Sequence, residues 1–263
     1  MSHLLLGGES GRAGLVAIVS AMREELCALL PMLAPVRTVE IGGRQLYIGE
    51  LQGREVILVL SGIGKVAAAT TATLLIQTFN ASALVFTGVA GGLHADVSVG
   101  DVVIAHQLLQ HDMDASPIFP RFEVPLTGRS HFDASPALGA SLAAAAQRCL
   151  GAGAGFVGSP ELAAFGIHAP RVHRGLIVSG DRFVSTSTES AALRGLLPAA
   201  LAVEMEGAAL AQVCFDFDRP FAVLRTISDR ADDHATVDFQ AFIADVASAY
   251  TRAIVLDWLA ASA

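Results

Sequence analysis

The fold is decided by the stretch Ala83-Leu84-Val85-Phe86-Thr87-Gly88-Val89-Ala90-Gly91-Gly92, in which an apolar run ends in a cluster of small residues. Short apolar runs that contain β-branched and aromatic residues are typical of buried strands. In open α/β sheets, ligands bind beyond the carboxyl ends of such strands. The glycine-rich end is therefore either a tight structural turn or part of a binding site.

Strand and helix patterns alternate on both sides of this stretch, over the whole chain. Such an alternation predicts an α/β fold with a central mixed sheet that is flanked by helices on both faces. The segment 111–133 shows no helical or strand periodicity in its apolar residues, so we expect a long loop there. Long loops of this kind often act as lids or binding elements. The expected strands are 15–20, 37–41, 45–51, 55–60, 83–87, 101–105, 171–179, 201–203 and 221–227, and the expected helices are 22–33, 64–79, 136–150, 187–196, 207–214 and 239–260.

The composition is that of one folded domain with a large core. Of the 263 residues, 53% are hydrophobic and 16% are charged, which excludes a disordered chain. No linker or repeat divides the sequence, so we expect a single domain over 14–263 and a disordered leader over 1–13. The mean hydropathy is +0.55, but no run reaches the roughly 18 apolar residues of a membrane span, and the start lacks signal-peptide features.

Charge and cysteine usage exclude several classes of partner. A net charge of −8 without a basic cluster argues against nucleic acid. Cys27, Cys149 and Cys214 are odd in number and far apart, which predicts free thiols in the reducing cytoplasm. The spacing of His111, Asp112 and Asp114 matches no standard metal site, so we expect no metal.

The segment Gly62-Ile63-Gly64-Lys65-Val66-Ala67 resembles a dinucleotide-binding fingerprint, because it follows a strand and begins a helix. That fingerprint also needs an acidic residue about 20 positions later for the ribose. No Asp or Glu occurs between Glu55 and Asp96, and the P-loop spacing is absent as well. We therefore expect no nucleotide cofactor, although these glycines allow a ligand to approach the backbone closely.

Two carboxylates lie in the apolar segment Val203-Glu204-Met205-Glu206-Gly207, and no Lys or Arg occurs between Arg194 and Arg219. Burial of such groups is unfavourable unless something binds them. Adjacent sugar hydroxyls are suitable partners, because one carboxylate accepts two hydrogen bonds side by side. The structural alternative is a salt bridge to a distant residue such as Arg225.

Further acidic residues follow two other expected strands. Glu24 and Glu25 come after the first strand, where carboxylates also complement a helix dipole. Ser228 and Asp229 end the last strand, where a cap or an Asx turn is the structural alternative. Because the chain has no Gly-x-Ser-x-Gly elbow and suggests no Cys–His pair, covalent catalysis is not indicated.

Seven motifs in this order make the chain similar to the 5′-methylthioadenosine/S-adenosylhomocysteine nucleosidase family, within the purine nucleoside phosphorylase-like superfamily. Each motif alone is weak, but the ordered set is specific. The motifs are Ala21-Met22-Arg23-Glu24-Glu25, Ser61-Gly62-Ile63-Gly64-Lys65-Val66, Thr87-Gly88-Val89-Ala90-Gly91-Gly92-Leu93, Val99-Gly100-Asp101, Ser179-Gly180-Asp181-Arg182-Phe183, Val203-Glu204-Met205-Glu206 and Arg225-Thr226-Ile227-Ser228-Asp229.

The resemblance implies a homodimeric hydrolase without a cofactor, which releases adenine from a 5′-thio-substituted ribose. It implies that Glu25 activates the attacking water, that Asp229 protonates adenine at N7, and that Glu206 holds the ribose hydroxyls. It assigns Arg225 and Ser228 to ordering the water and the acid. Further implied substrate contacts are Met22, Ile63, Val89, Ala90, Gly91, Phe183, Val184, Glu204, Met205 and Phe239, and the implied partner loop carries Phe119, Phe122 and Pro125.

One departure leaves alternatives open. Members of the family commonly have a serine where this chain has Val89, so that a hydroxyl near the ribose or the water is lost. An aminofutalosine nucleosidase shares the same motifs. A phosphorylase would need arginines around a phosphate, and Glu24 and Glu25 beside Arg23 would repel that anion. A non-catalytic adenine-nucleoside-binding protein is the fourth possibility, and only Val89 favours it.

Overall fold

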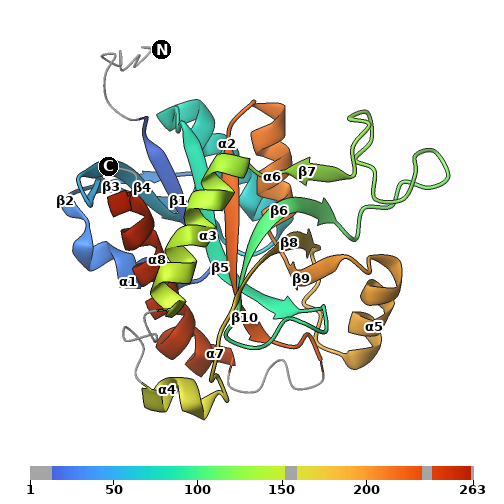
Figure 1. Cartoon of the computed structure of the whole chain (residues 1–263). Coiled ribbons are helices and arrows are strands. Elements are labelled where there is room, and N and C mark those ends of the chain that lie inside the picture. Colours follow the sequence, from blue (N-terminus) through green and yellow to red (C-terminus); the bar gives the residue numbers. More distant parts are fainter. Residues whose placement is uncertain (1–13, 152–158, 233–238, 262–263) are drawn as a thin grey trace.

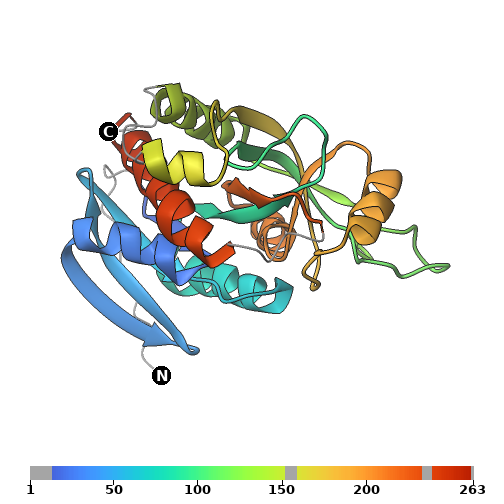
Figure 2. The same cartoon turned by 90° about the horizontal axis from the view of Figure 1, so that it is seen from below.

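The computed structural model describes residues 14–151, 159–232 and 239–261, so the expected leader 1–13 lies outside the described residues. They form one mixed ten-stranded sheet with helices on both faces (Figures 1 and 2), which confirms the predicted fold class. The strands are β1 (Val16–Ser20), β2 (Ala34–Ile41), β3 (Arg44–Leu51), β4 (Arg54–Leu60), β5 (Ala83–Gly92), β6 (Val102–Gln110), β7 (His131–Asp133), β8 (Val172–Ser179), β9 (Ala200–Glu204) and β10 (Phe221–Asp229).

Helices cover the two faces of the sheet in separate layers. Helices α2 and α6 pack against each other on one face, and α8 packs between α1 and α3 on the other (Figure 2). None of the helices within the described ranges has the length and apolar character to cross a bilayer. The bounds are α1 (Arg23–Leu29), the 3₁₀ turn η1 (Leu30–Met32), α2 (Lys65–Phe79), α3 (Pro136–Gly151), α4 (Ser159–Ala164), α5 (Ser187–Leu196), α6 (Gly207–Asp216), α7 (Phe239–Phe242), the π-helical turn η2 (Ile243–Ala247) and α8 (Ser248–Ala261).

Strand β5 lies at the centre of the sheet. It pairs in parallel with β1 and β10, and its last residues pair antiparallel with β9. Through β6 and β8 this set closes into a ring of five strands, in the order β5, β10, β6, β8 and β9. On the other side of β5 the sheet continues as β1, β4, β3 and β2. The carboxyl ends of β1, β4, β5 and β10 therefore meet at one edge.

The glycine-rich end of β5 is strand and not a tight turn, so the structural alternative for this stretch was wrong. The strand continues through Gly92 and stays paired with β10 and β9. A Cβ at Gly88 would lie 2.8 Å from Arg225 Nη1, and one at Gly91 would lie 2.9 Å from Asp229 Oδ1. These glycines leave the space into which side chains of the neighbouring strand pack.

Four other elements differ from the expectation. The strand expected at 101–105 continues to Gln110 as β6, and α4 was not predicted. The long segment after β6 is a loop, apart from β7, and it extends away from the sheet in Figure 1. The helix expected over 239–260 is interrupted by the π-helical turn η2.

We expect Gly88→Ala to lower the free energy of unfolding by about 1–3 kcal/mol, because the added methyl group overlaps the buried guanidinium of Arg225. Gly195→Ala is the matched control. Its added Cβ meets no atom within 4 Å, and removal of a helical glycine stabilises by up to about 1 kcal/mol. Urea unfolding of both variants measures the difference, and equal midpoints would contradict the packing argument.

Candidate active site

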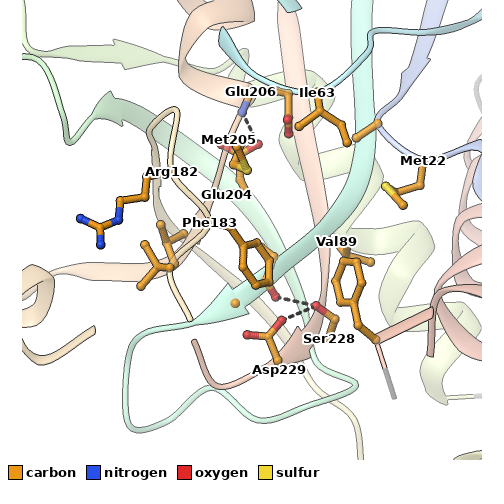
Figure 3. Close-up of a pocket in the computed structure, with 16 residues that line it drawn as sticks. Met22, Ile63, Val89, Arg182, Phe183, Glu204, Met205, Glu206, Ser228 and Asp229 are labelled. Carbon is orange, nitrogen blue, oxygen red and sulfur yellow. Dashed lines mark hydrogen bonds between the residues drawn. The ribbon is translucent and has the colours of Figure 1, made fainter. Parts of the chain in front are cut away.

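One cavity lies at the edge where the carboxyl ends of the parallel strands meet (Figure 3). Its empty volume is about 740 Å³, including the open mouth, which is within the usual range for small-molecule sites. Segments that are far apart in sequence contribute to it, as predicted for strand ends in an α/β sheet. The lining residues are Ala21, Met22, Ile63, Val89, Ala90, Gly91, Arg182, Phe183, Val184, Val203, Glu204, Met205, Glu206, Ser228, Asp229 and Phe239.

Large apolar side chains form much of the wall. Phe183 and Phe239 meet edge to face, with ring centroids 6.0 Å apart. Ile63 is 65% exposed and Phe183 is 43% exposed, so apolar surface remains open to solvent at the cavity. An aromatic wall of this kind suits a flat heteroaromatic ring.

Glu206 presents a buried carboxylate to the cavity. Its Oε1 accepts a hydrogen bond of 2.8 Å from the backbone N–H of Gly64, the residue before α2. Burial raises the pKa of Glu206 to about 7, and the negative charge of Glu204 adds to the effect. Gly64 adopts a left-handed φ of +93°, which orients this N–H without the strain of a side chain. The glycine motif that resembles a dinucleotide fingerprint thus holds a carboxylate.

Glu204 and Arg225 form a buried ion pair. Arg225 Nη2 lies 2.6 Å from Glu204 Oε2, and Arg225 is fully buried. Glu204 also accepts hydrogen bonds from Ser179 Oγ and from the backbone N–H of Gly207. The carboxylate of Glu204 is therefore committed to the protein, although part of the residue lines the cavity. Arg225 is not among the lining residues.

The two acidic residues of this segment have different roles, which the sequence could not distinguish. The salt-bridge alternative holds for Glu204, whose partner is Arg225. Glu206 has no salt bridge to a residue in the described ranges, and the backbone of Gly64 donates to it. Of the two, only Glu206 keeps hydrogen-bonding capacity for a ligand.

Asp229 lies at the far end of the cavity from Glu206 in Figure 3. Ser228 Oγ donates to its Oδ2 at 2.7 Å, and the backbone N–H of Ala231 donates to its Oδ1 at 2.7 Å. Burial raises the pKa of Asp229 above the usual range, and these hydrogen bonds oppose the rise. The carboxyl group is thus oriented and more readily protonated than a free aspartic acid.

Glu25 is fully buried in α1 and is not itself among the lining residues, whereas Met22 is. It accepts hydrogen bonds from the backbone N–H of Met22 at 3.4 Å and from Thr251 Oγ1 at 3.2 Å. Burial raises the pKa of Glu25 to about 7, and the positive charge of Arg225 opposes the rise. Glu25 therefore exchanges a proton near neutral pH.

The structure places most of the expected contact residues in the cavity wall. The exceptions are Glu25 and Arg225, and also Phe119, Phe122 and Pro125. Phe122 instead packs against an apolar cluster of its own chain, with Arg121 over its ring at 5.0 Å. Three further residues line the cavity although no sequence motif predicted them, and each is the direct chain neighbour of a predicted one: Ala21, Arg182 and Val203.

Three charged residues, Lys65, Asp112 and Asp181, connect the loop that precedes Phe183 to the start of α2, and we call them the clasp. Lys65 Nζ lies 2.6 Å from Asp112 Oδ1, and the backbone N–H of Lys65 donates to Asp181 Oδ1 at 2.7 Å. The backbone N–H of Asp181 in turn donates to Asp112 at 2.9 Å. Asp112 thus has a positioning role. Among the described residues, no group of three or more His, Cys, Asp or Glu side chains is arranged to hold a metal.

Three buried carboxyl groups with raised pKa values therefore lie in or beside one cavity, and each comes from a different segment. Carboxyl groups of this kind act as general acids and bases near neutral pH. The aromatic wall and the carboxylate of Glu206 suit a ligand that combines a flat ring with adjacent hydroxyls. The arrangement fits acid–base chemistry on a nucleoside-like molecule.

Comparison with known proteins agrees with this geometry. The profile of the Phosphorylase superfamily matches residues 15–260. A 5′-methylthioadenosine/S-adenosylhomocysteine nucleosidase from Neisseria meningitidis, in complex with methylthio-immucillin-A, is 35% identical with a TM-score of 0.82, over 95% of this chain and 100% of that chain. The corresponding nucleosidase from Colwellia psychrerythraea, in complex with adenine, is 32% identical with a TM-score of 0.80, over 94% and 95%. Futalosine hydrolase of Helicobacter pylori is 31% identical with a TM-score of 0.77, over 93% and 97%.

We expect Glu25→Gln to stabilise the fold at pH 8 and to leave its stability unchanged at pH 4. A folded-state pKa of about 7, against 4.5 for a free group, means that stability present below pH 4.5 is lost as the pH rises through 7. The loss amounts to about 3 kcal/mol for such a shift, and glutamine avoids it.

Urea unfolding at the two pH values measures this change. Glu24→Gln is the matched control, because Glu24 is the exposed neighbour of Glu25, and little change is expected at either pH. A Glu25→Gln variant that is no more stable than the wild type at pH 8 would show that ionisation of the buried carboxyl group does not destabilise the fold.

Proposed function

The chain belongs to the phosphorylase superfamily, and from that premise we propose that it hydrolyses the N-glycosidic bond of 5′-methylthioadenosine and S-adenosylhomocysteine. The enzyme is an N-glycosyl hydrolase of the nucleosidase type. The products are adenine and the 5′-thio-substituted ribose. The observation that carries the proposal is the set of three buried carboxyl groups around one aromatic-walled cavity, two of them with a pKa of about 7.

Asp229 acts as the general acid. Cleavage of the glycosidic bond builds negative charge on the purine, and protonation at N7 makes the purine a better leaving group. The raised pKa lets Asp229 carry a proton that a free aspartic acid would have lost. The hydrogen bond from Ser228 fixes the orientation of the carboxyl group. In this orientation the carboxyl group can still form a hydrogen bond to the purine.

Glu25 acts as the general base. A carboxylate with a pKa of about 7 is basic enough to take a proton from the attacking water and is still partly ionised at neutral pH. The positive charge of Arg225 favours the ionised form. Acid and base on opposite sides of the scissile bond are the arrangement that inverting glycoside hydrolysis requires.

The remaining wall residues bind the nucleoside. Glu206 accepts hydrogen bonds from the ribose hydroxyls, and Met205 packs under the sugar. Phe183 stacks on adenine, while the backbone of Val184 contacts its edge. The 5′-thio substituent binds in an apolar slot, because burial of a thioether against apolar side chains is favourable. Met22, Ile63 and Phe239 form this slot.

Two alternative reactions are separable. The similarity to futalosine hydrolase makes an aminofutalosine-type nucleoside the second candidate substrate. A phosphorylase needs cationic groups at the anomeric carbon, but Arg23 lines a different cavity, beside Arg44 and Tyr47. Arg182 lies at the wall but pairs with Glu189. Water is therefore the favoured acceptor.

The proposal predicts release of adenine from methylthioadenosine in phosphate-free buffer, measured by chromatography. Asp229→Asn should keep the fold and lower kcat by about 10²–10⁴-fold, because the general acid is lost. Asp245→Asn is the matched control, since Asp245 is exposed on η2, and its kcat should equal that of the wild type.

Three outcomes separate the possibilities. Adenine release only after phosphate addition would identify a phosphorylase. Faster release from aminofutalosine than from the two thio-nucleosides would identify the second substrate class. Unchanged hydrolysis by Asp229→Asn would refute the assignment of the acid.

The proposal includes a homodimer in which a partner loop closes the 5′ slot. The loop after β6 extends from the molecule (Figure 1) and carries the apolar residues Phe119, Phe122 and Pro125. Ile118 and Leu126 in the same loop are 82% and 92% exposed. Exposed apolar groups on a loop and at a cavity mouth are complementary in an association between two copies.

Sedimentation velocity of the full chain tests this proposal. We expect a dimer, and we expect Ile118→Arg with Leu126→Arg to shift the enzyme toward monomer and to raise KM for methylthioadenosine. Val36→Arg is the control, because Val36 is 49% exposed on β2, on the opposite side of the molecule in Figure 1. A wild-type monomer with full activity would contradict the partner loop.

The proposal also places the enzyme in the cytoplasm. Cys27, Cys149 and Cys214 are all free thiols in the structure. Free, unpaired cysteines are typical of a reducing compartment. Fractionation of growing cells, followed by detection with an antibody against the chain, tests this location, and we expect the protein in the cytoplasmic fraction.

A further inference from the structure

Thr251 is a fully buried threonine of α8 whose hydroxyl group hydrogen-bonds outside its own helix. Its Oγ1 donates to Glu25 Oε1 in α1 at 3.2 Å, across 226 positions of the chain, and Glu25 is fully buried as well. Threonine hydroxyls within helices commonly donate to a carbonyl oxygen one turn earlier, and three threonines of α2 do so: Thr70, Thr71 and Thr73. Thr251 instead connects two helices.

The hydrogen bonds of Glu25 fix its carboxyl group at both oxygens. Thr251 donates to Oε1, and the backbone N–H of Met22 donates to Oε2 at 3.4 Å. Asp229 is held in the same way, by the hydroxyl of Ser228 and by one backbone N–H. The proposed base and the proposed acid thus have the same kind of support. For Asp229 the hydroxyl comes from the adjacent residue, whereas for Glu25 it comes from a distant helix.

The helix that supplies Thr251 also supplies part of the cavity wall. Segments α7, η2 and α8 follow one another without a break, and Phe239 at their start lines the cavity. Phe239 and Thr251 are 12 positions apart, which in a regular helix of about 3.6 residues per turn would point them about 120° away from each other. The π-helical turn η2 lies between them and takes up one additional residue. The two side chains therefore return to nearly the same side of the helix.

Other charged groups also act on Glu25. Burial raises the pKa of Glu25 to about 7, against the positive charge of Arg225 and the hydrogen bond from Thr251, which lower it, and the negative charge of Glu24 adds to the rise. Tyr250, beside Thr251, is neutral, because burial raises its pKa to about 12. The remaining charged residues of η2 and α8 are exposed or paired elsewhere: Asp245, Arg252 and Asp257. The hydroxyl of Thr251 is thus an uncharged donor that favours the ionised form of Glu25.

We propose that Thr251 is the positioning residue of the general base, and that its hydroxyl holds the carboxylate of Glu25 in the orientation that takes a proton from the attacking water. This rests on the proposed hydrolytic function. In the reaction one O–H bond of the water breaks and its proton goes to Glu25, while the oxygen bonds to the anomeric carbon. The electrons of the broken C–N bond leave with the purine, which takes the proton of Asp229. Thr251 keeps its own proton.

The pH profile of kcat/KM for methylthioadenosine tests the proposal. Thr251→Val keeps the shape of the side chain and removes the donor, so that the pKa of Glu25 rises and the base is ionised only at higher pH. We expect the acidic limb of the profile to move up by about one pH unit, the equivalent of one hydrogen bond to a charged group. The value of kcat/KM should then be about tenfold below that of the wild type near pH 6 and close to it near pH 9.

Further variants isolate the hydroxyl group. Thr251→Ser should restore the wild-type position of the acidic limb, whereas Thr251→Ala, which differs from it only by the hydroxyl, should move the limb as Thr251→Val does. Ser248→Ala is the matched control on the same helix, because the hydroxyl of Ser248 donates to the carbonyl oxygen of Ala244 and not to Glu25. The profile of this control should equal that of the wild type.

The position of the limb separates positioning of the base from a structural role. A threonine that only stabilises the packing of α8 against α1 would lower the Tm when it is replaced and would reduce kcat/KM by the same factor at every pH. A moved limb that Thr251→Ser restores supports the proposal. An acidic limb that Thr251→Val and Thr251→Ala leave in place overturns it, whatever their effect on the Tm.

Failure of the proposed function gives a different result. If the wild type releases no adenine from any of the tested nucleosides, the hydrolytic function fails, and the role of Thr251 in it fails as well. If the wild type hydrolyses them with the same acidic limb as the two variants that lack the hydroxyl, only the role of Thr251 fails.

Discussion

The buried guanidinium of Arg225 is the constraint on which the site depends. A charge in the interior is tolerated only when its donors are satisfied, and here Glu204 from β9 and the backbone oxygen of Phe86 in β5 accept from it. Gly88 leaves the space that the side chain needs. The ion pair and the hydrogen bond to Phe86 thus join three strands of the closed ring, β9, β10 and β5, at the edge of the cavity.

The chemistry of the cavity follows from this fixed frame. Because Arg225 neutralises Glu204, the second carboxylate of the segment, Glu206, is left for a ligand. The same positive charge acts on Glu25 from the other face of β10 and moderates the effect of its burial. Raised pKa values at these groups destabilise the fold near neutral pH and give it acid–base function, a balance that is common at active sites.

Several loops depend on groups that lie outside the reacting centre. The clasp of Lys65, Asp112 and Asp181 orients the loop of Phe183 toward the start of α2. Glu206 is oriented by a backbone N–H at the same helix start. The start of one helix, α2, therefore positions both the proposed base-stacking group and the proposed sugar-binding group. A change in its first turn would alter the position of both groups.

The sequence by itself determined the α/β class and the superfamily, because alternating apolar periods and ordered motifs are local patterns that survive without coordinates. It also identified the acidic residues that lack a nearby cation. Only the tertiary structure separated Glu204 from Glu206, extended β5 through its glycines, and directed the backbone N–H of Gly64 to Glu206. These facts depend on strand register and on contacts between segments that are separate in the chain, such as Gly64 and Glu206, which are 142 residues apart, and such contacts leave no periodic signal in the sequence.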